Sequence, residues 1–140
     1  MDDLVEREGL YYKKFSDVPF TGEIEGREQG KFTNGKKEGP WVFYHDNGQL
    51  NEKGDYKNGK REGFWLKYFG GGSESVGYKY YYKNGEADGP SFSYDRNGQL
   101  RSKGTVKNGT YEGPWVFYEN DGTLNTDKSG VYQDGIKISD

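Results

Sequence analysis

The chain has 140 residues, a formal net charge of −3 and no cysteine. This length is that of one domain, and the missing cysteine excludes a disulfide framework and thiol chemistry. Aliphatic side chains are scarce, but 13 Tyr, 8 Phe and 3 Trp take their place. Because flat rings can cover a sheet without filling a thick interior, we expect a folded but thin protein.

The chain opens with MDDLVEREG, and the patterned region begins close behind it. No apolar run is long enough for a membrane span or for the apolar part of a signal peptide. These observations leave the localisation open between a cytoplasmic protein and an exported one whose leader is removed.

From residue 30 onward the sequence is periodic. Asn-Gly or Asp-Gly recurs at Gly35, Gly59, Gly85, Gly109 and Gly135, and a second series of turns falls at Gly48, Gly72, Gly98 and Gly122. A fixed period of this size is typical of stacked repeats, in which each unit needs its neighbours. We expect one domain over residues 1–140, made of a degenerate unit 9–29, units 30–53, 54–76, 77–103 and 104–129, and a partial unit 130–140.

The segments between the turns are rich in Tyr, Phe, Trp, Val and Thr and show no helical period, which is typical of β-hairpins. We therefore predict an all-β fold: an elongated, twisted, single-layer antiparallel sheet of repeated hairpins, with about 10 to 12 strands. An apolar face on a single layer is too large to leave in water, so the sheet is expected to curl over one aromatic-rich face or to pair with another copy.

Residue parity gives a prediction about the two faces. Of the 16 Leu, Ile and Val residues, 14 lie at even positions, and successive side chains of a strand point to opposite faces. If one parity tracks one face throughout, the loops must have odd lengths. We therefore expect three-residue loops closed by a glycine bulge rather than two-residue type I′ turns.

The unit G-x-Y-x-N-G-K-x-E-G-x-W-x-x-Y-x-x-x-G-x-L is read at residues 30–50 and 54–68. It resembles the MORN repeat, in particular its bacterial variant, over roughly residues 9–135. The resemblance implies an elongated sheet of successive hairpins. Many bacterial members are labelled antitoxins of toxin–antitoxin systems, and eukaryotic relatives are described as scaffolds or membrane-associated modules. Ser91 departs from the pattern, because it stands where other units have tryptophan.

The odd-numbered face supplies the candidate partner-binding residues, which are Trp41, Phe43, Trp65, Tyr81, Trp115 and Phe117. Trp and Tyr often dominate protein interfaces, so these rings are candidate anchors for a protein partner. The alternative is that each ring packs on a neighbouring strand and only stabilises the sheet.

No catalytic, metal or cofactor site is predicted. The acidic turn column of Glu38, Glu62, Asp88 and Glu112 has cations beside it, so a solvated edge is favoured over acid–base chemistry. His45 is the only histidine and lies at a hairpin tip. The Asp and Asn residues of HDNG and ENDG lack the spacing of a calcium loop and are explained by turn chemistry.

The acidic chain, with a pI of about 5.3, argues against nucleic-acid binding by YKYYYK at residues 78–83 and against docking on an anionic membrane. The sequence therefore predicts a non-enzymatic repeat scaffold that binds a protein partner, with an antitoxin-like or immunity-like role as one version. Two alternatives stay open: a self-associating structural protein that forms a homo-oligomer, and a protein that binds carbohydrate or cell surfaces through exposed Trp rings.

Overall fold

The computed structural model of the protein describes residues 3–71 and 74–140, so Gly72 of the second turn series lies outside the described residues. Within these ranges no helix is long and apolar enough to cross a membrane. The strands are β1 Leu4–Arg7, β2 Leu10–Lys13, β3 Gly22–Ile24, β4 Glu28–Thr33, β5 Lys36–Tyr44, β6 Leu50–Lys57, β7 Lys60–Tyr68, β8 Val76–Lys83, β9 Glu86–Tyr94, β10 Leu100–Lys107, β11 Thr110–Phe117, β12 Gly130–Gln133 and β13 Ile136–Ser139.

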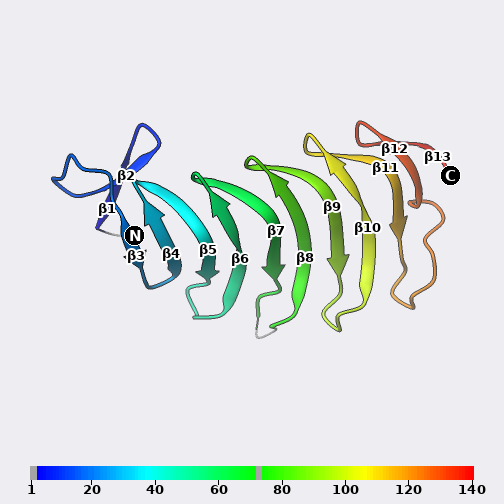
Figure 1. Ribbon diagram of the computed structural model, residues 1–140. Helices are drawn as coiled ribbons and strands as arrows, with labels where there is room; N and C mark the ends of the chain where they lie inside the picture. The colour runs from blue at the N-terminus through cyan, green and yellow to red at the C-terminus, as the bar shows by residue number, and fades with distance from the viewer. Residues whose placement is uncertain (1–2, 72–73) are drawn as a thin grey trace.

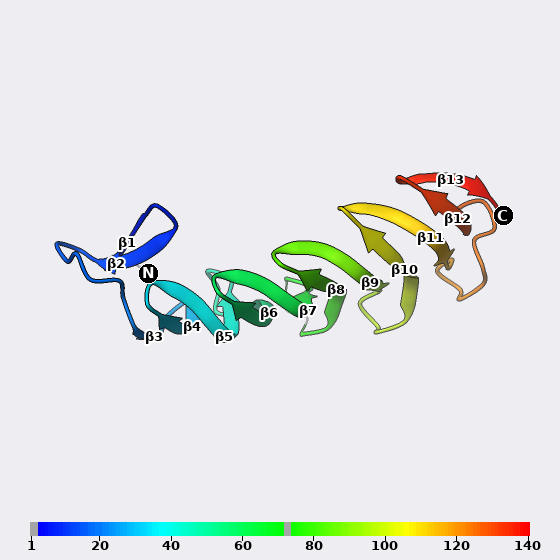
Figure 2. The same cartoon turned by 45° about the horizontal axis from the view of Figure 1, so that its top comes forward.

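Strands β3 to β13 form one antiparallel sheet in which every strand pairs with its neighbours in the chain. β1 and β2 form a separate two-stranded sheet at the N-terminal end. Figure 1 shows the strands side by side from one end of the molecule to the other, and Figure 2 shows that the sheet is bent and stays open at both ends. The predicted elongated, all-β sheet of repeated hairpins is confirmed.

The Asn-Gly turns differ from the prediction. Thr33 pairs with Lys36, so the loop between β4 and β5 has only two residues. Both are left-handed, with φ of 50° at Asn34 and 82° at Gly35, as a type I′ turn requires. The expected three-residue loops with a closing bulge are therefore wrong. The bulges lie inside the strands, for example where the register of β6 and β7 shifts between Lys53 and Asp55.

The expectation that one parity tracks one face is also wrong, for the same reason. A two-residue loop places an even residue opposite an odd one, as Phe32 opposite Lys37 shows. The five-residue loop after β5 preserves parity at Tyr44 and Leu50, but the register then shifts, and Trp41 lies opposite Gly54. Even residues of β4, β6, β8 and β10 therefore share a face with odd residues of β5, β7, β9 and β11.

We call this shared surface the tryptophan face. It carries the core, and its large side chains are Phe32, Trp41, Phe43, Tyr56, Trp65, Tyr78, Tyr80, Tyr82, Tyr111, Trp115 and Phe117. Aliphatic side chains such as Val42 and Leu66 lie on the other surface, the opposite face. Since the sheet is a single layer, the burial of the tryptophan rings comes from the bend of the strands and from neighbouring side chains.

Each buried tryptophan lies on a glycine of the preceding strand. A Cβ atom added to Gly54 would lie 2.3 Å from Cδ2 of Trp65, so only glycine fits under the ring. The Trp65 indole Nε1 donates a hydrogen bond to the carbonyl oxygen of Asp55 at 3.0 Å. Trp41 and Trp115 lie in the same way on Gly30 and Gly104. This Gly–Trp pair is the structural unit of the repeat.

The acidic turn column links one hairpin to the next. A carboxylate oxygen of Glu38 accepts a hydrogen bond from the backbone N–H of Asn58 at 2.8 Å, and Glu62 accepts one from Asn84 at 2.9 Å. Glu112 accepts in the same way from Asp134. These carboxylates therefore satisfy turn N–H groups that would otherwise need water.

Candidate functional site

The structure separates the six residues predicted as partner anchors. Trp41, Trp65 and Trp115 are 0, 1 and 3% exposed, so these rings pack inside the molecule and offer little surface to a partner. Phe43 and Phe117 are half-buried on the tryptophan face. The predicted shared face is wrong for Tyr81, which lies on the opposite face against Phe64, with ring centroids 5.0 Å apart.

In the N-terminal half, the chain's own cations cover the rings of the tryptophan face. The Nζ atom of Lys37 lies 5.0 Å from the Trp41 ring centroid and 5.1 Å from that of Tyr56. Arg61 lies 4.0 Å over Trp65 and forms an ion pair with Glu52. Such contacts are attractive because the ring face is electron-rich. Burial lowers the pKa of Lys37.

Counted from residues 30–53 as the first, the third unit (residues 77–103) lacks this arrangement. Tyr80 of β8 stands where the other units have glycine, and it pairs with Ser91 of β9, where they have tryptophan. Position 87, which is equivalent to Lys37 and Arg61, is alanine. Ser91 is buried under this part of the sheet, and so is Ser102 of β10. A long cationic side chain is thus replaced by Ala87, and a tryptophan by Ser91, at neighbouring places on this face.

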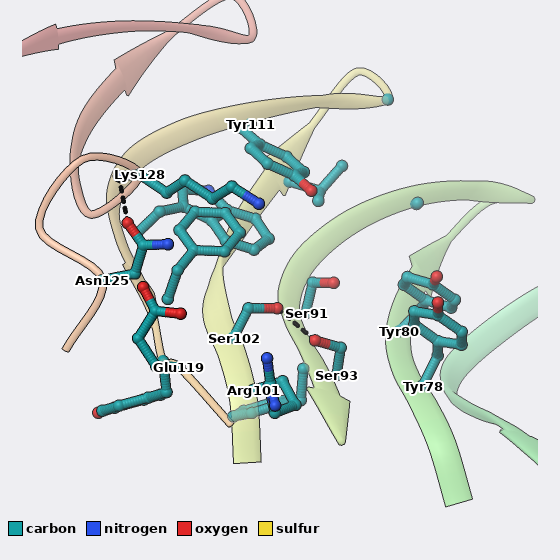
Figure 3. Close-up of a pocket in the computed structure, with 17 residues that line it drawn as sticks. Tyr78, Tyr80, Ser91, Ser93, Arg101, Ser102, Tyr111, Glu119, Asn125 and Lys128 are labelled. Carbon is teal, nitrogen blue, oxygen red and sulfur yellow. Dashed lines mark hydrogen bonds between the residues drawn. The ribbon is translucent and has the colours of Figure 1, made fainter. Parts of the chain in front are cut away.

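These replacements leave a cleft of about 520 Å³ on the tryptophan face. It lies over β9 and β10 and is lined by residues of β8 to β11 and of the loop that follows β11. Figure 3 shows Ser91, Ser93 and Ser102 between two aromatic groups, with Tyr78 and Tyr80 on one side and Tyr111 on the other. The hydroxyl groups of Ser93 and Ser102 are hydrogen-bonded to each other. A volume of this size is typical of small-molecule sites, roughly 300–1,000 Å³.

The two walls of the cleft are stacks of parallel rings. Tyr78 and Tyr80 stack with their ring planes 6° apart and their centroids at 5.7 Å. On the other side Tyr111 stacks on Trp115 at 3.9 Å, and Trp115 on Phe117 at 5.7 Å. Tyr78 is 44% and Tyr111 38% exposed, so both walls present aromatic surface to a ligand.

Polar side chains border the cleft at its end near the loop after β11. Arg101 is hydrogen-bonded to Asn120, and Asn125 accepts a hydrogen bond from the backbone N–H of Lys128. Glu119, Asn125 and Lys128 line this end of the cleft, and in Figure 3 the Lys128 side chain extends toward Tyr111 while the Glu119 carboxylate lies beside Asn125. The rim thus contains two cations, one carboxylate and one amide.

The environment of the wall raises the pKa of Tyr80 to about 12. Burial is the main cause, and the neighbouring phenols of Tyr78, Tyr82 and Tyr111 add to it. Tyr80 therefore keeps its hydroxyl proton throughout the physiological pH range and remains a hydrogen-bond donor.

The sequence contained signals for this site. Ser91 is a gap in the tryptophan series, and Tyr78 and Tyr80 have the same parity, which places them on one face of their strand. The sequence did not show that Ser91 lies beside Tyr80 on the same face, because this depends on the two-residue turn between β8 and β9. The coincidence of a lost glycine at Tyr80 with a lost tryptophan at Ser91, 11 residues later as in the other Gly–Trp pairs, was the available clue.

The polar turn residues considered for metal binding have local partners. Asn47 Oδ1 accepts a hydrogen bond from the backbone N–H of Gln49 at 2.9 Å, and Asp46 forms an ion pair with Arg27. Asp121 accepts from Thr123 in the same way, and hydrogen bonds from Thr123 lower the pKa of Asp121. Among residues 3–71 and 74–140, no cluster of three His, Cys, Asp or Glu side chains is arranged to hold a metal ion.

The open sheet defines the class as a single-layer β-hairpin repeat protein, with a cleft on one of its faces. The model of the MORN repeat variant matches residues 37–58 and 87–108. Each matched stretch covers all but the first residue of one strand, the five-residue loop after it and the whole of the next strand, namely β5–β6 and β9–β10. No curated protein matches the chain.

Proposed function

We propose that the protein is a non-enzymatic scaffold that binds a protein partner on the tryptophan face near Phe43. One observation carries this proposal: Phe43 and Tyr56 stay partly exposed on the tryptophan face of a single-layer sheet, while the β1–β2 hairpin packs on the N-terminal end of that face through Leu4 and Tyr11. Sheets normally bury such a face against another element. The match to the MORN repeat variant is consistent with a scaffold role.

The proposed surface combines aromatic and charged groups. Phe43 stacks between Trp41 and Trp65, with centroid distances of 6.0 Å to each, while Lys37 and Arg61 border it. Aromatic side chains and arginine are the residues that most often contribute large binding energies in protein interfaces. The aromatic core of this surface is pre-organised by the buried tryptophans beneath it.

Neutralisation of a toxin, as an antitoxin-like or immunity-like protein of bacterial origin, is the more specific form of this proposal. It rests on the resemblance to the bacterial variant of the repeat. The proposed absence of catalysis rests on the acidic column, whose carboxylates accept backbone N–H groups of neighbouring turns. The competing function is self-association through the same face.

The experiment is site-specific photocrosslinking in the native host. A benzophenone amino acid replaces Phe43 on the tryptophan face or, as the matched control, Val42 on the opposite face. We expect a foreign protein to be captured from position 43 and not from position 42. Calorimetry with the purified partner should then show binding weakened about tenfold by Phe43→Ala.

Two results would reject the proposal. Equal capture from positions 42 and 43 would show that the tryptophan face is not the interface. Capture of a second copy of the chain, together with a dimer mass by light scattering, would establish the self-associating alternative instead.

A further inference from the structure

The cleft between β8 and β11 is a local feature of one unit. In three units the pairs Gly30–Trp41, Gly54–Trp65 and Gly104–Trp115 fill the face. In the remaining unit the large and small residues are exchanged between strands, with Tyr80 and Ser91. The exchange moves the aromatic bulk to the side of the cleft and leaves small hydroxyl side chains beneath it.

The width of the cleft suits a single flat ring. Trp115 lies over Gly104 of β10, so one wall is above β10 and the other, made by Tyr78 and Tyr80, is above β8. Two strand spacings separate them, ~10 Å between the backbones that carry the walls. This width admits one flat ring with a van der Waals contact of ~4 Å to the aromatic side chains on each side.

The polar groups indicate which kind of ring fits. Ser91, Ser93 and Ser102 provide hydroxyl groups that both donate and accept, Glu119 only accepts, and the cations only donate. A polyproline segment presents carbonyl acceptors and no proline N–H donors, so it would leave Glu119 unmatched. A sugar ring carries hydroxyls of both kinds around its edge and apolar C–H groups on its faces.

The charges at the rim disfavour the other flat ligands. Arg101 and Lys128 would repel a cationic side chain, and in the N-terminal half the equivalent rings already hold Lys37 and Arg61. A nucleic-acid strand needs a basic surface, whereas the chain has a net charge of −3. A sugar requires no net charge at the site.

We propose that this cleft binds a pyranose unit of an oligosaccharide, with the sugar ring between the Tyr78–Tyr80 stack and Tyr111. Serine hydroxyls at the floor and the polar groups at the rim bind the sugar hydroxyls. This site is distinct from the protein-binding surface near Phe43 and does not depend on it. It also differs from recognition by exposed tryptophans, because the tryptophans are buried and the tyrosines form the accessible walls.

The test uses the full chain and defined oligosaccharides. Soluble hexasaccharides of β-1,4-linked glucose, mannose, N-acetylglucosamine and uronate are titrated by calorimetry and by tyrosine and tryptophan fluorescence. We expect at least one of them to bind with a Kd below about 1 mM. If none binds with a Kd below about 10 mM, the proposal is wrong.

The decisive variant is the double substitution Tyr80→Gly with Ser91→Trp, which restores the Gly–Trp pair of the other units and fills the cleft. It should keep the fold, as judged by circular dichroism, and weaken sugar binding at least about tenfold. Tyr111→Ala, at an exposed wall, should also weaken binding about tenfold. Phe64→Ala, at a ring that is 41% exposed on the opposite face, is the control and should bind as wild type.

Unchanged sugar binding in both the double variant and Tyr111→Ala would overturn the assignment of the cleft. A loss of binding in Phe64→Ala equal to that in Tyr111→Ala would do the same, since it would place the sugar on the opposite face. Neither result bears on protein capture at Phe43, so the two proposals fail separately.

Discussion

The second unit (residues 54–76) and the third unit (residues 77–103) have the same strand pairing but different side-chain packing on the tryptophan face. In the second unit Trp65 lies on Gly54, and Arg61 covers the ring. In the third, Tyr80 and Ser91 occupy these two positions, and the face is hollow. The strand pairing continues through both units. The comparison teaches that the turns and hydrogen-bond ladders define the fold, whereas the Gly–Trp pair decides whether a unit is a packed support or a site.

Removal of a buried ring should distinguish the two units most strongly. Trp65→Ala deletes a side chain that is 1% exposed and is expected to lower the free energy of unfolding by about 3–5 kcal/mol. Ser91→Ala, the equivalent position in the hollow unit, should lower it by less than about 1 kcal/mol because little packing is lost. Urea denaturation followed by circular dichroism measures both. Similar losses in the two variants would refute the distinction between a packed and a hollow unit.

A methyl group placed under a tryptophan should have the next largest effect. In Gly54→Ala the new Cβ would lie 2.3 Å from the Trp65 ring, and the ring must move, at a cost of about 2–3 kcal/mol in the free energy of unfolding. Gly70→Ala is the control, because its nearest neighbour would be His45 Nε2 at 3.8 Å. That variant should stay within about 0.5 kcal/mol of wild type in the same denaturation assay. A harmless Gly54→Ala would mean that the Gly–Trp contact is not a packing constraint.

The smallest expected effect is a loss of stability at alkaline pH, caused by the titration of Tyr80 in the cleft wall. The folded pKa of Tyr80 is about 12 and its ordinary value is 10.0. Between these values the folded chain holds a proton that the unfolded chain has lost, so the free energy of unfolding falls as pH rises. Below pH 10 this contribution is fully present. Melting temperatures at pH 9 to 12 should therefore fall more steeply for wild type than for Tyr80→Phe, and parallel curves would contradict the burial of this phenol.

The architecture was predictable because turns and strands leave local signals. Asn-Gly at Gly35 and its equivalents, with aromatic and β-branched segments between them, is enough to predict a ladder of hairpins. The faces were not predictable by parity, since parity depends on the number of residues in each loop and on the one-residue register shifts beside Tyr44, Tyr68 and Leu100. One residue more or less in a loop reverses the face of every side chain that follows.

The candidate site was only partly predictable. The tryptophan column was found from the sequence, but the burial of Trp41 and Trp65 follows from a contact with glycines of the neighbouring strand, 11 residues earlier in the chain. The cleft depends on a second long-range relation, the meeting of Tyr80 with Ser91. Neither relation is visible from residue type alone, because both require the register of the strands.

The carboxylates that cap the hairpin tips at Asn58, Asn84 and Asp134 give the sheet a direction. Glu38 accepts the hydrogen bond from the tip at Asn58, and Glu62 accepts that from the tip at Asn84. Each of these carboxylates belongs to the hairpin on the N-terminal side of the tip that it caps. At the N-terminal end, the Thr21 hydroxyl oxygen accepts the corresponding hydrogen bond from the backbone N–H of Asn34. Shortening from the C-terminal end would leave the tips at Asn58 and Asn84 capped, whereas removal of the hairpin that carries Glu38 would uncap the tip at Asn58. In the last hairpin the position equivalent to Glu38 and Glu112 is Ile138, so a further unit at the C-terminal end would have to form its tip without this cap.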